Sequence, residues 1–159
     1  WTHAMSMNGP MASPVVFDGN KIFISTVRSD GFSVVEVKEG TEREVLQAGT
    51  MKNEFSSCLY HNGFIYGYDV DAQQCVSATS GDKHWTKRVF GKGSLIIVDD
   101  NLLVLSDKGK LIQVKATSEA YTEQGSFQAL EGKSWTAPSF AGGRLYVRNL
   151  TEMACYKLF

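Results

Sequence analysis

Short apolar runs separated by tight polar turns recur four times along the chain. Each repeat has one apolar run, a turn, and a second run in which polar and apolar residues alternate; the repeats span residues 13–25, 56–68, 94–106 and 136–148. The turns consist of Asp18-Gly19-Asn20, His61-Asn62-Gly63, Asp99-Asp100-Asn101 and Gly142-Gly143. Because Asn, Asp and Gly tolerate a positive φ, such turns between two β-rich runs predict β-hairpins.

A third β-like run follows each hairpin, and a more polar fourth run follows in the first three repeats. The third runs cover residues 31–38, 72–79, 109–116 and 152–159. The fourth runs cover residues 41–48, 82–89 and 121–130, and polar outer strands protect the edge of a sheet from pairing with other chains. No stretch shows a sustained 3.6-residue apolar period, so the pattern predicts an all-β chain. Four-stranded antiparallel units that repeat every ~40–45 residues are typical of a β-propeller.

We therefore expect one propeller segment over residues 1–159. Its four blades are predicted at about 13–49, 56–89, 94–130 and 136–159. The last repeat has no fourth run, and the N-terminal residues 1–8 are a candidate for that outer strand, since Trp1-Thr2 repeats the Trp85-Thr86 of the second repeat. The segment is then half of an eight-bladed ring, a small closed ring, or one of two copies that complete a ring.

Charge and hydropathy exclude several classes of protein. Sixteen Lys and Arg residues against 17 Asp and Glu residues give a net charge of −1, without the basic patch expected of a nucleic-acid-binding protein. No apolar run approaches the ~18–20 residues that a membrane-spanning helix needs. The start of the chain also lacks the charged and apolar regions of a secretory leader.

The three cysteines, Cys58, Cys75 and Cys155, are isolated and lie within apolar runs. They form no C-x-x-C pair and have no histidine at metal-ligand spacing, so the pattern predicts small buried side chains in strands. A disulfide between two of them would leave the third as a free thiol. Their redox state stays open at this level.

Residues with catalytic potential are scattered, and none forms a recognisable site. The histidines His3, His61 and His84 have no Ser, Cys or carboxylate at the spacing of a catalytic triad. The acidic stretch 68–74 lacks the glycine of a calcium loop, and the glycine-containing stretches 90–94 and 131–134 lack the remainder of a phosphate loop. We therefore assign no catalytic, cofactor-binding or metal-binding residues.

Large aromatic side chains lie in or next to the predicted strands, where packing between blades explains most of them. They include Phe17, Tyr60, Tyr66, Trp85, Trp135 and Tyr146. Some of these rings are also candidates to line a carbohydrate or peptide groove at the mouth of a propeller. The sequence does not separate the two roles.

Residues 77–85, SATSGDKHW, resemble the D-A-x-T-G-x-x-x-W signature of the PQQ-like (quinoprotein alcohol dehydrogenase-like) β-propeller repeat family. Ala78, Gly81 and Trp85 match the signature, whereas Ser77 replaces its Asp and Ser80 its Thr. The stretches 91–117 and 130–158 are similar to the final blades of bacterial members of the family, BamB-like assembly factors among them. This resemblance implies the C-terminal half of a longer propeller, located in the periplasm or outside the cell.

The resemblance also allows a comparison with the residues that the family's dehydrogenases use for catalysis. The family's dehydrogenases carry a vicinal Cys-Cys pair, calcium ligands and a catalytic Asp, and no residues of this chain match that set. We therefore expect no cofactor, and we expect a non-enzymatic binding or scaffolding module for a protein partner. The alternatives are a fragment of a PQQ-dependent oxidoreductase and a carbohydrate-binding or carbohydrate-processing propeller.

Overall fold

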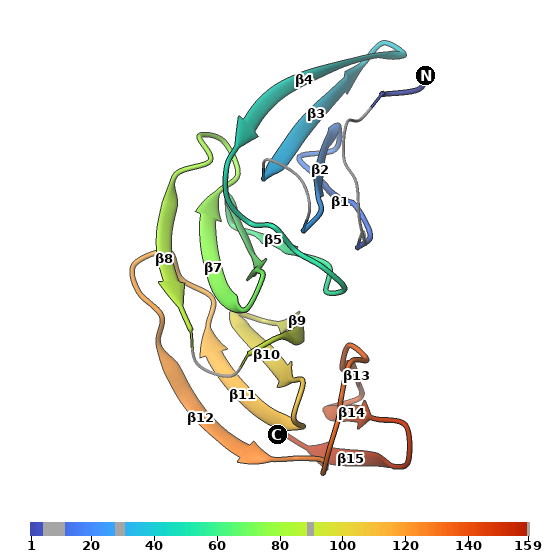
Figure 1. The fold of residues 1–159 in the computed structure, drawn as a ribbon, viewed down its shortest axis with the longest axis vertical. Helices are drawn as coiled ribbons and strands as arrows, with labels where there is room; N and C mark the ends of the chain where they lie inside the picture. The colour runs from blue at the N-terminus through green and yellow to red at the C-terminus, as the bar shows by residue number, and fades with distance from the viewer. Residues whose placement is uncertain (5–11, 28–30, 89–90, 159) are drawn as a thin grey trace.

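The computed structural model describes residues 1–4, 12–27, 31–88 and 91–158, and it is built entirely from β-strands and their connections. Four antiparallel sheets follow one another along an arc (Figure 1). The first sheet contains β1 (Val15–Phe17), β2 (Lys21–Ser25), β3 (Phe32–Lys38) and β4 (Thr41–Ala48). The second contains β5 (Leu59–His61), β6 (Phe64–Asp69), β7 (Ala72–Ser77) and β8 (Lys83–Lys87). The predicted all-β propeller architecture is confirmed.

The third and fourth sheets repeat the same plan. The third contains β9 (Gly93–Val98), β10 (Asn101–Ser106), β11 (Lys110–Lys115) and β12 (Glu123–Gln128). The fourth contains β13 (Ser139–Ala141), β14 (Arg144–Arg148) and β15 (Met153–Lys157), so it has three strands among the described residues. Within every sheet the strands lie in sequence order, as a meander of consecutive hairpins.

The predicted hairpin turns form where the Asn, Asp and Gly residues stand. Asn62 and Gly63, for example, have φ values of 49° and 86°, and the flanking strands pair from His61 with Phe64 onward. Each four-stranded sheet also contains a register shift between its third and fourth strands, at Val34/Val35, Cys75/Val76 and Gln113/Val114. A bulge of this kind bends the outer strand and increases its twist, which suits strands on the outside of an arc.

Strand β10 shows why its sequence is a continuous apolar run. Successive side chains of a strand point to opposite faces of the sheet, and the third sheet lies between two others. Leu102 and Val104 therefore pack into the cluster shared with the second sheet, whereas Leu103 and Leu105 pack into the cluster shared with the fourth. Burying a side chain of this size contributes about 1.5–3 kcal/mol, so both faces of the strand stabilise the stack.

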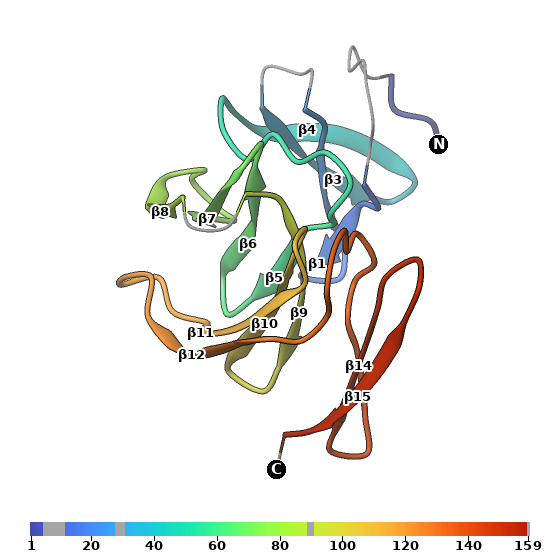
Figure 2. The same cartoon turned by 60° about the horizontal axis from the view of Figure 1, so that its bottom comes forward.

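The two ends of the arc differ from the interior. Residues 1–4 form no strand, and Nδ1 of His3 lies 4.0 Å from Oε1 of Glu42 on β4, at the end of the arc away from the fourth sheet (Figure 1). The strand expected over residues 1–8 is therefore absent from its first half, and residues 5–8 lie outside the described residues. At the other end, the fourth sheet turns one face outward (Figure 2).

Two of the three cysteines are buried as predicted, and the third is not. Cys58 and Cys75 lie in the clusters between sheets, and all three thiols are free. Cys155 is exposed because it lies on the outward face of β15, opposite the partly exposed Tyr146 of β14, and no fifth sheet covers that face in the described structure. The prediction of a buried Cys155 is therefore wrong.

Candidate functional site

Loops from several sheets converge on one face of the arc. Because the strands alternate in direction, the connections between sheets and the turns between second and third strands lie at the same end of each sheet. We call the surface that they form the loop face. Its elements include the connections 49–58 and 129–138 and the turns 70–71, 107–109 and 149–152.

Two aromatic side chains from separate connections stack on the loop face. The ring centroids of Phe55 and Trp135 are 5.3 Å apart with an interplanar angle of 20°. Phe55 is 55% exposed and Trp135 is 50% exposed, so the stacked pair remains open to solvent. Lys133 places Nζ 3.7 Å from the centroid of the Trp135 ring, a distance typical of a cation–π contact.

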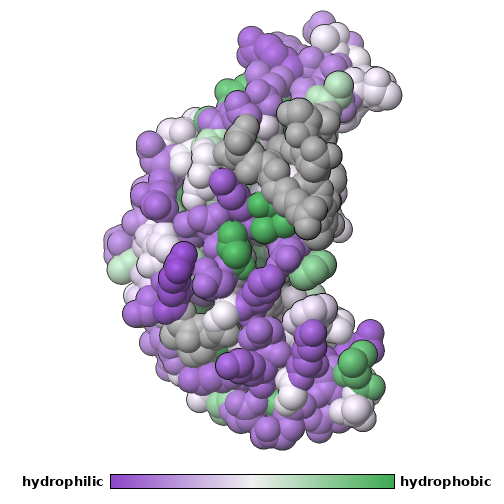
Figure 3. Space-filling view, in the orientation of Figure 1, coloured by the Kyte–Doolittle hydropathy of each residue, from purple (hydrophilic) through white to green (hydrophobic). Residues whose placement is uncertain are grey.

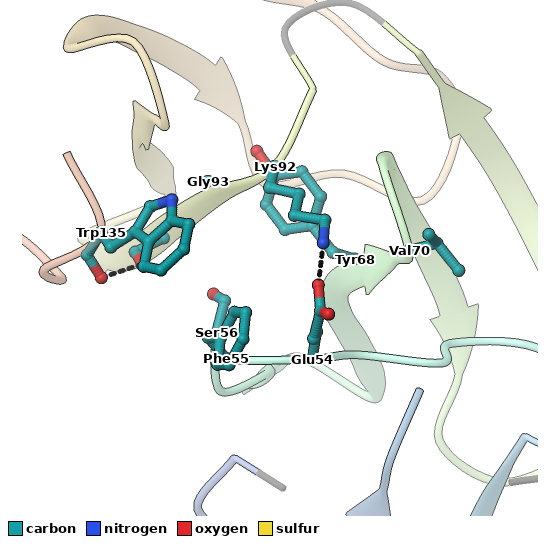
Figure 4. A pocket seen from close by; sticks show the side chains of 9 residues that line it. Glu54, Phe55, Ser56, Tyr68, Val70, Lys92, Gly93 and Trp135 are labelled. Carbon is teal, nitrogen blue, oxygen red and sulfur yellow. Dashed lines mark hydrogen bonds and ion pairs between the residues drawn. The ribbon is translucent and has the colours of Figure 1, made fainter. Parts of the chain in front are cut away.

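A narrow pocket opens beside this pair (Figure 4). Lys92 forms an ion pair with Glu54 at its rim and lies 5.9 Å from the centroid of the Phe55 ring. The space inside is about 20 Å³, enough for one water molecule and too little for an organic ligand. The stacked rings, rather than this pocket, are therefore the larger feature available to a partner.

The wall of the narrow pocket depends on a close approach between two sheets. A methyl group added to Gly93 would lie 2.6 Å from the hydroxyl oxygen of Tyr68, so only glycine fits there without displacement. Burial raises the pKa of the Tyr68 hydroxyl above its usual range, and the neighbouring Tyr121 and Asp107 raise it further. The phenol is therefore neutral, and it forms a fixed, uncharged part of the site.

On the other side of Trp135 lies a wider depression of about 300 Å³. Its lining combines two cations with apolar and polar side chains: Lys133, Trp135, Thr136, Arg148, Asn149 and Leu150. Leu150 is 90% exposed at the tip of the turn between β14 and β15. An exposed leucine next to a half-exposed tryptophan is a combination suited to burial by another molecule.

Four exposed apolar side chains thus belong to the loop face, and we refer to them as the apolar stripe. They are Val70, Phe55, Trp135 and Leu150. Figure 3 shows hydrophobic side chains on this side of the molecule, beside the hollow of the arc and over the fourth sheet. Large exposed apolar side chains grouped on one face and rimmed by charged residues are typical of interaction sites.

The residues that the sequence offered for catalysis lie apart from one another. Nε2 of His61 lies 3.0 Å from Oδ1 of Asp100, between two hairpin turns at the opposite end of the sheets from the loop face. His84 contacts the edge of the Phe64 ring at 4.9 Å, and His3 lies beside β4. Within the described ranges, no three His, Cys, Asp or Glu side chains are grouped to hold a metal ion.

The acidic stretch 68–74, which lacks the glycine of a calcium loop, contains the tight turn between β6 and β7. Oδ1 of Asp69 accepts a hydrogen bond of 3.0 Å from the backbone N–H of Lys52, and Asp71 pairs with Arg88 at 3.5 Å. Val70 between them adopts a φ of 59°, which turns its side chain out as part of the apolar stripe.

The aromatic residues named from the sequence divide into two groups. Phe17 and Tyr60 stack at 4.7 Å, and Tyr66 and Trp85 are buried between sheets, so these four have packing roles. The other two are exposed: Trp135 contributes to the apolar stripe, whereas Tyr146 lies on the outward face of the fourth sheet. Sequence reasoning missed its partner Phe55, whose only signal was a large apolar residue in the polar loop NEFSS.

Comparison with known proteins supports the fold. No model of a known protein family matches the chain, and no curated protein matches its sequence. Among solved structures, BamB from Moraxella catarrhalis aligns with 94% of this chain at a TM-score of 0.74 and 14% identity. AztD from Citrobacter koseri aligns with 94% at 0.61 and 16% identity, and a europium-containing methanol dehydrogenase with 68% at 0.55 and 14% identity.

These similarities show that the chain has the fold of a β-propeller segment, the fold that the SATSGDKHW motif predicts. The chain spans 47% of the length of BamB, 43% of AztD and 23% of the methanol dehydrogenase. The chain therefore matches a part of each of these proteins, and it matches the methanol dehydrogenase over only 68% of its own length. At this level of identity the likeness establishes the fold. Any activity has to be argued from the residues of the site. In the described part of the chain, no helix is long and apolar enough to cross a membrane.

Proposed function

We propose that this chain is part of a propeller that acts as a binding and scaffolding module, and that a protein partner docks on its loop face. The observation that carries the proposal is the stacked pair of Phe55 and Trp135, which is held by two separate connections and left half exposed. Aromatic side chains at the centre of an apolar surface supply most of the binding free energy in protein interfaces. The structural likeness to BamB supports the same reading.

The geometry favours a protein over a carbohydrate. A sugar ring stacks on an open aromatic face, whereas the indole of Trp135 is already in contact with Phe55 and Lys133. The narrow pocket beside it holds about 20 Å³, which is too small for a sugar ring, and the wider depression offers no aromatic ring other than Trp135 among the described residues that line it. A protein surface, in contrast, can cover the whole apolar stripe at once.

The proposal has two further parts. We further propose that the protein works outside the bacterial cytoplasm, in the periplasm or beyond it, and its likeness to BamB supports this proposal. The outward face of the fourth sheet supports packing of a further blade against Tyr146 and Cys155, leaving the Arg148–Met153 pair beside the turn 149–152 at its margin. That blade belongs either to a second copy of this chain or to a longer protein, and light scattering distinguishes a dimer from a chain of 17.5 kDa.

A three-part binding assay tests the function. The chain is applied to an array of random peptides, titrated with a panel of sugars while Trp fluorescence is recorded, and mixed with PQQ, Ca²⁺, a redox dye as electron acceptor and a panel of primary alcohols as electron donors. We expect binding to array peptides that Trp135→Ser removes and that Tyr146→Ser, a change of an exposed aromatic residue outside the loop face, preserves. Saturable quenching by a sugar without peptide binding would favour the carbohydrate alternative. Dye reduction would favour the oxidoreductase alternative.

A further inference from the structure

We propose that the 300 Å³ depression beside Leu150 selects peptide segments in which an acidic residue stands next to a large apolar residue. This inference rests on the proposed function, because it names the chemistry of the partner that docks on the loop face. The apolar side chain covers Leu150 and the edge of Trp135. The carboxylate meets Lys133 and Arg148.

The charges around the depression support an acidic ligand. Lys133 and Arg148 are exposed cations that form no ion pair within the part of the chain that the structure describes. The neighbouring carboxylate of Glu152 is already engaged, since its Oε1 accepts a hydrogen bond of 2.9 Å from the backbone N–H of Glu131. Two cations therefore remain available at the rim of an apolar surface.

Lys92, a further cation near the Trp135 ring, is differently placed. Lys92 is paired with Glu54 at the narrow pocket, so its charge is compensated within the chain. Attraction for a carboxylate is consequently concentrated on the Lys133 side of the Trp135 ring. This asymmetry sets the direction in which we expect a peptide to lie, with its acidic residue towards the fourth sheet.

The depression is preorganised by one buried side chain. Oδ1 of Asn149 accepts hydrogen bonds from the backbone N–H groups of Thr151 at 2.9 Å and Glu152 at 2.8 Å. Its Nδ2 donates to the carbonyl oxygen of Glu131 at 2.7 Å, which joins the turn 149–152 to the connection that carries Trp135. Leu150 is thus presented by a fixed turn, and a partner pays less ordering entropy on binding.

The connection that carries Trp135 is also fixed to the third sheet. The backbone N–H of Ser134 donates to the carbonyl oxygen of Asp107 at 2.9 Å, and the Ser134 side chain is buried. Lys133 and Trp135 on either side of it are exposed. The cation and the indole therefore have a defined spacing, which is what selection of neighbouring acidic and apolar residues requires.

Fluorescence anisotropy with labelled peptides tests the inference. The probe is an acetylated, amidated Gly-Ser-Asp-Phe-Glu-Leu-Asp-Ser-Gly peptide. One comparison peptide carries Lys at each acidic position, and another carries Ser in place of Phe and Leu. We expect the probe to bind at least tenfold more tightly than either, and to weaken as salt rises because the contacts with the cations are exposed.

Variants separate the contribution of the two cations to peptide binding from that of Leu150. Lys133→Gln combined with Arg148→Gln is expected to weaken probe binding about three- to tenfold, as loss of two exposed ion pairs implies. Leu150→Ser is expected to weaken it at least as much. Lys83→Gln on β8 and Val16→Ser on β1 are matched controls, since both side chains are exposed and lie outside the depression, on other sheets.

The outcomes distinguish this inference from the proposed function. If the acidic and basic peptides bind equally, or if the double variant binds the probe as the wild type does, the charge selection is wrong and peptide binding by the loop face stands. If no peptide of the probe set or of the array binds, the proposed function itself is wrong. Thermal midpoints within 2 °C of the wild type, about the spread that exposed substitutions cause, show that each variant is folded.

Discussion

The indole Nε1 of Trp85 donates a hydrogen bond of 2.7 Å to the carbonyl oxygen of Thr117. Trp85 lies on β8 of the second sheet, and Thr117 lies in the connection between β11 and β12 of the third. The same indole is 8% exposed and meets the Tyr121 ring edge-on at 5.7 Å. One side chain thus joins neighbouring sheets by both packing and a directed hydrogen bond, at the position of the tryptophan in the family signature.

We expect Trp85→Ala to lower the free energy of unfolding by about 3–5 kcal/mol, because it leaves a cavity between two sheets. Trp85→Phe keeps most of the packing and removes the hydrogen bond, and it is expected to cost about 1–3 kcal/mol. Urea denaturation measures both. The matched control is Trp135→Ala, a half-exposed tryptophan whose loss should cost below about 1 kcal/mol. Equal effects at the two positions would contradict the assignment of Trp85 as the link between sheets.

A pair of glycine substitutions tests the close approach at the narrow pocket. Gly93→Ala would place its methyl group 2.6 Å from the Tyr68 hydroxyl and 2.8 Å from the carbonyl oxygen of Leu105. Since the backbone cannot move freely there, we expect a loss of about 1–3 kcal/mol. Gly125→Ala on β12 has nothing within 4 Å of the new methyl group and is expected to be close to neutral. A denaturant midpoint for Gly93→Ala equal to that of Gly125→Ala would refute the close contact.

The number of cysteine thiols that react with a reagent reports on folding. Burial raises the pKa of the Cys58 and Cys75 thiols to about 12, so both remain protonated and shielded in the folded chain at pH 8. Cys155 is exposed. A thiol reagent such as dithionitrobenzoate is therefore expected to modify one thiol per native chain quickly, and all three after denaturation. Rapid modification of two or three native thiols would contradict the burial of Cys58 and Cys75.

Asp18 links the first two sheets in a pH-dependent manner. Its carboxylate accepts hydrogen bonds from Nζ of Lys21 at 3.1 Å and from the hydroxyl of Tyr60 at 2.9 Å, and these contacts hold the pKa of the carboxyl below its usual range. A lowered folded-state pKa contributes stability that is present above the unfolded-state pKa and is lost as pH falls through the folded-state pKa.

We therefore expect Asp18→Asn to be less stable than the wild type at pH 7, with a difference that shrinks below about pH 4. Asn tolerates the φ of 47° at this position, so the substitution changes charge without straining the turn. Urea midpoints at pH 7, 5, 3 and 2 measure the difference. A gap that stays constant over this range would show that the charge of Asp18 has no part in it.

Much of the fold is predictable from the sequence because its signals are local. The turn Asn62-Gly63 and the alternation of β6 and β7 lie within a few residues of one another, and the same is true in each repeat. The continuous apolar run of β10 also indicates a strand covered on both faces. The bulges between third and fourth strands are backbone features without a side-chain signature, so the sequence did not reveal them.

The candidate site was less predictable because its parts come from distant segments. Phe55 and Trp135 meet only through the curvature of the arc, which sets how the connections of successive sheets approach one another. Cys155 was misplaced for a related reason. It lies in the third strand of its repeat, as Cys75 does, but no sheet covers its face in the described structure.

The most direct test of docking on the loop face uses the side-chain N–H signals of the three tryptophans in a ¹⁵N-labelled sample. The protein is titrated with whichever array peptide binds most tightly, and the indole signals are followed. We expect the Trp135 signal to shift in a saturable way, while those of buried Trp85 and of exposed Trp1, which lies beside the first sheet, remain in place. A peptide that binds while the Trp135 signal stays unchanged would contradict the account.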